Sequence, residues 1–158
     1  MEFFTIGVYG TTESDYFTKL VDNHIDFFCD IRQRRGVRGS KYTFVNSKSL
    51  QQKLFELNIR YLHVSGLAPT SEIRSLQKEA DLHQKETKKD RDKLSHIFML
   101  AYKSKVLDKF EMDTFIKDLI NNQAKRIILF CVEEKAEACH RSIVANQLEK
   151  MGYKITHL

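Results

Sequence analysis

The sequence predicts one α/β domain of the three-layer, Rossmann-like class, with about five mainly parallel strands and helices on both faces of the sheet. Short apolar segments rich in aromatic and β-branched residues recur along the chain, as is typical of buried strands. Segments with helical periodicity separate them, and strands that alternate with helices pair in parallel through right-handed crossovers. The chain has 158 residues, about the length of one domain, so we expect 1–158 to fold as a single unit.

Five segments have the composition of strands. We predict strands at 3–8, 26–31, 60–64, 126–132 and 153–158. Cys29 lies beside Phe28 inside the second of these segments, so we expect its thiol to lie in the core.

The intervening segments have the periodicity of helices. We predict helices at 13–21, 47–58, from about 71 onward, and at 96–110, 113–120 and 139–151. Thr70 or Ser71 is the expected N-cap of the third helix, which opens a charged helical segment at about 70–121. Within it, 85–93 carries charges of both signs, which favours a solvated helix face or a connection between helices. Gly152 follows the last helix, where a residue that tolerates positive φ is favoured.

Charge is distributed unevenly over a net total of +5. Residues 1–31 contain one Lys against six acidic residues, whereas 32–60 contain eight Lys or Arg against the single Glu56. A local basic cluster can attract an anionic partner, but the modest total argues against a DNA-packaging protein.

No segment has the length or composition of a membrane helix, and the N-terminus lacks the pattern of a signal peptide. Three cysteines, an odd number, favour free thiols over a disulfide framework. We therefore expect a cytoplasmic protein without a membrane partner.

The segment CVEEKAEACHR, 131–141, follows a predicted strand and begins a predicted helix. The carboxyl edge of an open α/β sheet is the usual ligand crevice, so this segment supplies the catalytic candidates Cys131, Glu133, Cys139 and His140. A helix N-terminus and a nearby arginine favour a thiolate over a thiol. The alternative is that Cys131 packs as a small buried hydrophobe, as free cysteines usually do.

Two specific kinds of site are disfavoured. A phosphatase-type thiolate loop needs an arginine at a fixed spacing after the cysteine, and the corresponding positions hold Glu137 and Ala145. A metal site lacks a Cys-x-x-Cys pair, and the adjacent Cys139 and His140 would project in different directions on a helix. We therefore expect no metal and no cofactor.

A metal site would instead require long-range convergence. Cys131, Glu133 and His140 could meet His63 or His157 only after folding.

Asp30 and Arg32 end the second predicted strand and, being two residues apart, point the same way into the expected crevice. The following loop, RRGVRGSK, adds arginines and two glycines that allow a ligand to approach the backbone. The candidate anion-binding residues are Arg32, Arg35, Arg38 and Arg141. The alternatives are a solvated basic loop, and an Arg141 that pairs with Glu133 or Asp30 and only braces the strand edges.

Six motifs in order resemble the domain of unknown function 488 family of bacteria and archaea. They are TIG, DIR, RGVRGSKY, NIRYLHV with the downstream LAPTSEIR, CVEEKAEACHR and the final THL. The resemblance spans essentially the whole chain. It implies a compact α/β fold with a site built from the DIR arginine and the cysteine, glutamate and CHR positions, but no agreed reaction.

These observations favour an enzyme that acts on a nucleotide, a nucleic-acid component or another phosphate-bearing anionic substrate. In that hypothesis Asp30, Glu133 or His140 transfers protons, and Cys131 or Cys139 is the nucleophile. Two alternatives remain open. One is a noncatalytic nucleic-acid-binding domain that uses the arginines on backbone phosphates, and the other is a structural or partner-binding protein.

Overall fold

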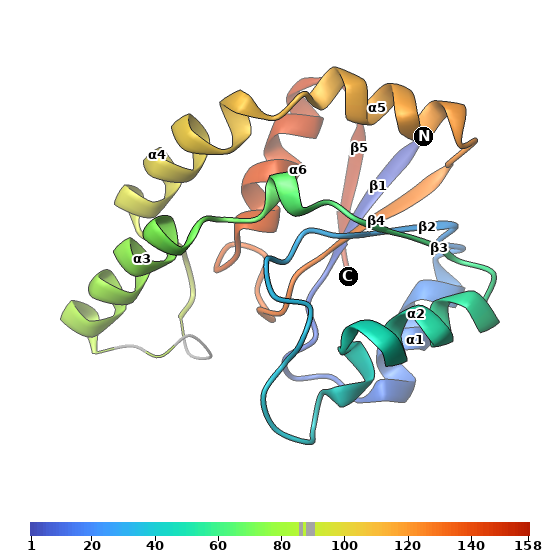
Figure 1. Cartoon of the computed structure of the whole chain (residues 1–158), viewed down its shortest axis with the longest axis horizontal. Coiled ribbons are helices and arrows are strands. Elements are labelled where there is room, and N and C mark those ends of the chain that lie inside the picture. Colours follow the sequence, from blue (N-terminus) through green and yellow to red (C-terminus); the bar gives the residue numbers. More distant parts are fainter. Residues whose placement is uncertain (86, 88–90) are drawn as a thin grey trace.

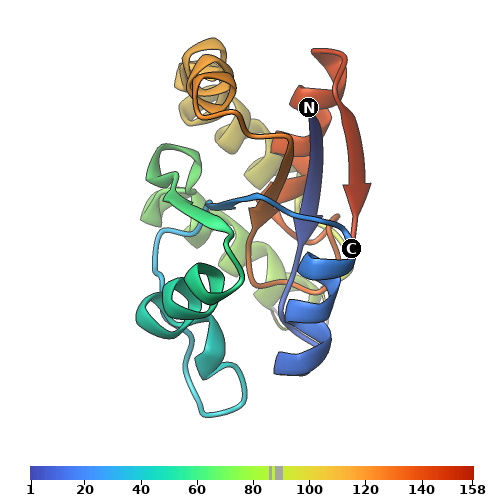
Figure 2. The same ribbon diagram turned by 90° about the vertical axis from the view of Figure 1, so that its right-hand side faces the viewer.

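The protein folds around one sheet of five parallel strands, in the order β3-β2-β4-β1-β5 (Figure 1). The computed structural model describes residues 1–85, 87 and 91–158. The strands are β1 (Glu2–Ile6), β2 (Phe27–Asp30), β3 (Arg60–His63), β4 (Arg126–Phe130) and β5 (Lys154–His157). All five predicted strands are present, and Figure 2 shows β1 between β4 and the edge strand β5. The predicted α/β class is therefore confirmed.

Six α-helices in the described part of the chain connect the strands. They are α1 (Glu13–Asp22), α2 (Ser47–Glu56), α3 (Ser71–Gln84), α4 (His96–Lys105), α5 (Met112–Asn121) and α6 (His140–Lys150). Because parallel crossovers are right-handed, α1 and α2 cover one face of the sheet and α3 to α6 the other, and Figure 1 shows the two groups apart. No helix among the described residues is long and apolar enough to cross a membrane.

Local signals set several helix ends as predicted. The Thr70 hydroxyl accepts a hydrogen bond from the Ile73 amide at 3.3 Å and caps α3. Gly152 follows α6 with φ of +91°, which residues with a side chain rarely adopt. The helix predicted at 96–110 is interrupted, however. It ends at Lys105, and a short 3₁₀ turn, η3 (Leu107–Lys109), follows.

The central strands are buried, and parallel pairing aligns their carboxyl ends. Ile6, Asp30 and Phe130 are register partners at the ends of β1, β2 and β4. The residues that follow these three strands therefore meet at one edge of the sheet. Cys29 is fully buried among the core side chains, as predicted, and burial raises the pKa of its thiol.

Candidate functional site

A cavity of about 620 Å³ opens at the carboxyl edge of the sheet. We call it the crevice. Its floor is formed by Cys131, Glu133, Cys139 and His140, and its basic wall by Arg32, Arg34, Arg38, Arg74, Lys78 and Arg91. Among the described residues, two acidic side chains, Asp81 and Glu133, line it against six basic ones, so this part of the crevice favours an anionic occupant.

Two thiols and an imidazole cluster on the floor of the crevice. Cys131 directly follows β4, Cys139 is the N-cap of α6, and His140 is the first residue of that helix. Both sulfur atoms lie 3.8 Å from His140 Nδ1, and all three side chains are buried. The cluster thus joins the end of a central strand to the start of a helix.

The prediction that Cys139 and His140 project in different directions is wrong. Cys139 has extended backbone angles, φ −136° and ψ 144°, because an N-cap residue precedes the helix proper. Both residues therefore face Cys131, and the three donor atoms lie within 4.8 Å of one another.

The two more distant histidines are engaged elsewhere. The His63 ring contacts the Arg32 carbonyl, and the His157 ring contacts the Thr5 hydroxyl.

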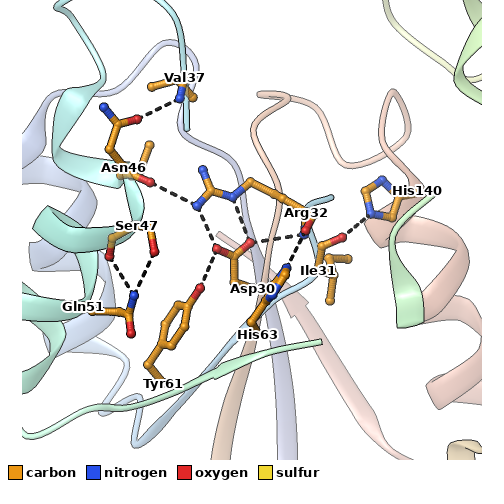
Figure 3. A network of polar contacts seen from close by, with 11 residues as sticks. Asp30, Ile31, Arg32, Val37, Asn46, Ser47, Gln51, Tyr61, His63 and His140 are labelled. Atoms are coloured by element: carbon orange, nitrogen blue, oxygen red, sulfur yellow. Dashed lines mark hydrogen bonds and ion pairs between the residues drawn. The ribbon is translucent and has the colours of Figure 1, made fainter. Parts of the chain in front are cut away.

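A backbone contact fixes the tautomer of His140. Its Nε2 lies 3.1 Å from the carbonyl oxygen of Ile31, the residue that follows β2 (Figure 3). A carbonyl only accepts, so in the neutral imidazole Nε2 carries the proton and the lone pair of Nδ1 points at the sulfur atoms. Burial lowers the pKa of His140, but the Cys131 sulfur, the Glu133 carboxylate and the carbonyl outweigh it, and the net pKa is raised.

Cys131 is held as a neutral thiol. Its sulfur lies 3.1 Å from Glu133 Oε2, where the thiol donates to the carboxylate. A hydrogen bond with Cys139, burial and the charge of Glu133 raise the pKa of Cys131 well above its usual value. Thiolate chemistry at this position therefore requires that its proton be transferred, and Nδ1 of His140 and the Glu133 carboxylate are the acceptors within reach.

Asp30 and Arg32 form one buried unit (Figure 3). Arg32 Nε and Nη2 donate to the two Asp30 oxygens at 2.8 and 2.7 Å, and the Arg32 amide and the Tyr61 hydroxyl donate to the same carboxylate. Burial and the Asp30 charge raise the pKa of Tyr61 to about 12. Four donors around Asp30 indicate that it orients Arg32, and its predicted catalytic role stays a prediction.

One donor of Arg32 remains available to a ligand. Its Nη2 also donates to the Val45 carbonyl, and the guanidinium lies 4.4 Å from the Phe130 ring centre. Its buried Nη1 has no hydrogen-bond partner among the described residues, although Arg32 lines the crevice. An unpartnered buried guanidinium nitrogen is costly unless a ligand or water occupies the adjoining space.

Arg141 braces the segment that carries Cys131 and Glu133. Its Nη1 and Nη2 donate to the carbonyl oxygens of Glu133 and Glu134 at 2.5 and 2.7 Å. The partners are thus backbone carbonyls and not the carboxylates considered from the sequence. Gly7, after β1, permits this packing, because a Cβ there would lie 1.9 Å from the Glu133 oxygen. The predicted anion-binding role of Arg141 remains a prediction.

The arginine loop only partly faces the crevice. Arg34 and Arg38 are exposed and line it, whereas Arg35 does not line it and lies near the Tyr61 hydroxyl.

The charged segment supplies part of the basic wall, namely Arg74, Lys78 and Arg91, which was not predicted from the sequence. Arg91 donates to Asp81 at 2.8 Å and to the Ala138 carbonyl at 2.9 Å, and both charged side chains are buried. The segment 85–93 lies between α3 and α4, in line with the predicted connection between helices, whereas the alternative of a solvated helix face is wrong for the buried Arg91. Positions 86 and 88–90 lie outside the described residues. The available signal was the spacing of Ile73, Gln77 and Asp81, four residues apart on one buried face of α3.

The comparisons with known proteins give one match. The model of a family described as "Domain of unknown function DUF488" matches residues 13–148. No curated protein and no solved structure matches the chain. The matched range includes every residue of the floor and basic wall of the crevice.

Proposed function

We propose, from the premise that this chain belongs to the DUF488 family, that it is an enzyme acting on a phosphate-bearing anionic substrate, such as a nucleotide or a nucleic-acid component. One observation carries this proposal: a single crevice places a basic wall beside a buried floor of two thiols, a carboxylate and an imidazole. The wall suits binding of the anion, and the floor suits its chemical conversion.

The wall offers guanidinium groups in two environments. Arg34 and Arg38 are exposed and form no ion pair with any residue that the structure describes, so their donors can reach a phosphate. Arg32 lies deeper, held by Asp30, with Nη1 unpartnered. Planar guanidinium donors match the oxygens of a phosphate better than an ammonium does. The wall therefore supports a substrate whose phosphate enters past the loop and is oriented by Arg32.

The floor offers proton transfer and a nucleophile. His140 presents Nδ1 as an acceptor, and Glu133 lies beside the Cys131 thiol. Transfer of a thiol proton from Cys131 or Cys139 to Nδ1 would form the thiolate that attacks the substrate and the imidazolium that stabilises it. Buried titratable groups with perturbed pKa values in a cavity are typical of active sites.

The two other hypotheses explain less of this arrangement. A noncatalytic nucleic-acid-binding surface needs exposed basic side chains but has no use for the buried cluster of Cys131, Cys139 and His140. A purely structural brace accounts for Arg141 and for the Asp30 carboxylate, but not for Arg34 and Arg38, which line the cavity and form no ion pair with a described residue.

Binding is tested by fluorescence anisotropy with short single- and double-stranded oligonucleotides at two salt concentrations, with mononucleotides as competitors. Replacing Arg34 and Arg38 by Gln should weaken binding and reduce the slope of log K against log[salt] by about 2 for duplex DNA. The matched control replaces Lys109 and Lys117, which are exposed and do not line the crevice. It should change neither the affinity nor the slope of log K against log[salt]. Equal effects in both variants would contradict an anion site in the crevice.

Catalysis is tested separately. Glu133→Gln and His140→Asn should abolish turnover of the ligands that bind while leaving their affinity within a few fold. If both variants retain full turnover, the floor is not the reaction centre.

A further inference from the structure

We propose that Cys131 Sγ, Cys139 Sγ and His140 Nδ1 bind a thiophilic divalent cation, zinc in the first place, and leave one coordination position open to the crevice. This reverses our expectation from the sequence that the protein holds no metal. The inference concerns the same cavity as the proposed function, but metal binding is measured without a substrate. The two proposals can therefore fail separately.

The spacing of the donor atoms fits a tetrahedral ion. With Zn–S near 2.3 Å and Zn–N near 2.05 Å, tetrahedral angles place sulfur about 3.6 Å from nitrogen and the two sulfurs about 3.8 Å apart. The observed distance from His140 Nδ1 is 3.8 Å to each sulfur, and the sulfur atoms lie within 4.8 Å of each other. Movements of a few tenths of an ångström in the sulfur–nitrogen distances suffice to bring both to the ideal value.

The orientation of His140 is that of a metal ligand. Its Nε2 donates to the Ile31 carbonyl, so in the neutral imidazole Nδ1 is unprotonated, and it lies 3.8 Å from both sulfur atoms. Histidine ligands almost always donate their second ring N–H to a carboxylate or a carbonyl in this way, which fixes the tautomer. This hydrogen bond is a second observation, independent of the clustering of the donors, that points to a cation.

The donor set selects the kind of ion. Thiolate and imidazole ligands suit zinc and other soft divalent cations and are poor ligands for magnesium or calcium. Two thiolates and one neutral imidazole also balance the charge of +2, so the ion and its three protein ligands carry no net charge, which favours their burial. The two protons displaced from Cys131 and Cys139 pass to solvent, which balances the binding reaction.

The open position distinguishes this site from a structural zinc site. All three donor residues line the crevice, and three protein ligands with one free position are typical of catalytic zinc. Glu133 lies beside the ligands, with Oε2 3.1 Å from Cys131 Sγ. A water bound at the free position would lose a proton to this carboxylate and become hydroxide. Cys₂His zinc sites with a nearby glutamate activate water in this manner.

In the metal-bound form the nucleophile of the proposed reaction is hydroxide, not a thiol. Both forms use the same basic wall, so the substrate class is unchanged.

The experiment is a zinc titration of the full chain, reduced and stripped with a chelator, against a competing chromophoric chelator. We expect one equivalent to bind. Cobalt(II) in its place should give sulfur-to-metal charge-transfer absorption and the visible bands of a tetrahedral site. Cys131→Ser, Cys139→Ser and His140→Ala should each weaken zinc binding by more than the roughly 10–100-fold that loss of an outer-shell hydrogen bond costs.

The matched control is Cys29→Ala, which removes a buried thiol outside the cluster and should leave zinc binding unchanged. Circular dichroism of each metal-free variant separates lost folding from lost ligation. If His140→Ala does not fold, His140→Gln takes its place. Absence of stoichiometric zinc binding, or binding that survives loss of both Cys131 and Cys139, would overturn the proposal. Glu133→Gln should weaken zinc binding by no more than the roughly 10–100-fold of a lost outer-shell hydrogen bond. A loss as large as in the cysteine variants would make Glu133 the fourth ligand and overturn the open position.

Discussion

Replacing Arg141 by Ala should destabilise the protein more than any exposed substitution. The guanidinium is 1% exposed and donates to two carbonyl oxygens, those of Glu133 and Glu134. A hydrogen bond from a charged donor contributes about 1.5–3 kcal/mol, so loss of both should lower the free energy of unfolding by about 3–6 kcal/mol. The brace also holds the segment that carries Cys131, so its loss should expose that thiol.

The assay is urea unfolding followed by circular dichroism, with thiol modification under native conditions as a second readout. Arg141→Lys keeps the charge but cannot span both carbonyls, so its free energy of unfolding should fall by about half as much as that of Arg141→Ala. If Arg141→Ala does not fold, the stability of Arg141→Lys can still be measured. The control is Lys103→Ala, which breaks an exposed ion pair with Asp108 and should cost at most about 1 kcal/mol. A loss below about 1 kcal/mol in Arg141→Ala, with unchanged thiol reactivity, would refute the brace.

Two further substitutions test other contacts at the edge of the sheet. Asp30→Asn leaves the buried Arg32 guanidinium unpaired and should lower the free energy of unfolding in urea by about 3–5 kcal/mol. The same substitution removes a negative charge beside Tyr61, so in an absorbance titration the pKa of Tyr61 should fall below about 12. An unchanged titration would show that burial alone raises that pKa. Gly7→Ala places a Cβ 1.9 Å from the Glu133 oxygen and should cost about 1–3 kcal/mol, whereas Gly36→Ala meets nothing closer than 3.7 Å and should be nearly neutral. Equal stabilities of the two alanine variants would contradict the packing described for Glu133.

The fold could be predicted because the local composition of the sequence identifies each strand. The run from Ile127 to Phe130 is apolar, is followed by titratable residues, and is separated from its neighbours by amphipathic segments. The break after Lys105 could not be predicted in this way, since no proline or glycine marks it. Local sequence fixes the type of these elements better than it fixes their ends.

The sequence predicted that Cys131, Glu133, Cys139 and His140 meet at one edge of the sheet, but it predicted neither their geometry nor the whole basic wall. That Cys139 and His140 face the same point depends on the extended backbone of an N-cap residue, and helical periodicity assumes that both belong to the helix. The contribution of Arg91 depends on a contact with Ala138, 47 residues away, for which no local pattern exists. Long-range contacts of this kind decide which charged residues become part of a cavity.

The contact between His140 and the Ile31 carbonyl has a consequence for how the site tolerates mutation. The partner that sets the imidazole tautomer is a main-chain atom, and every residue type at position 31 presents the same oxygen. Side-chain substitution there can perturb packing, but it cannot delete the acceptor. The tautomer of His140 is thus set by the path of the backbone, and a displacement of the end of β2 relative to α6 would change it.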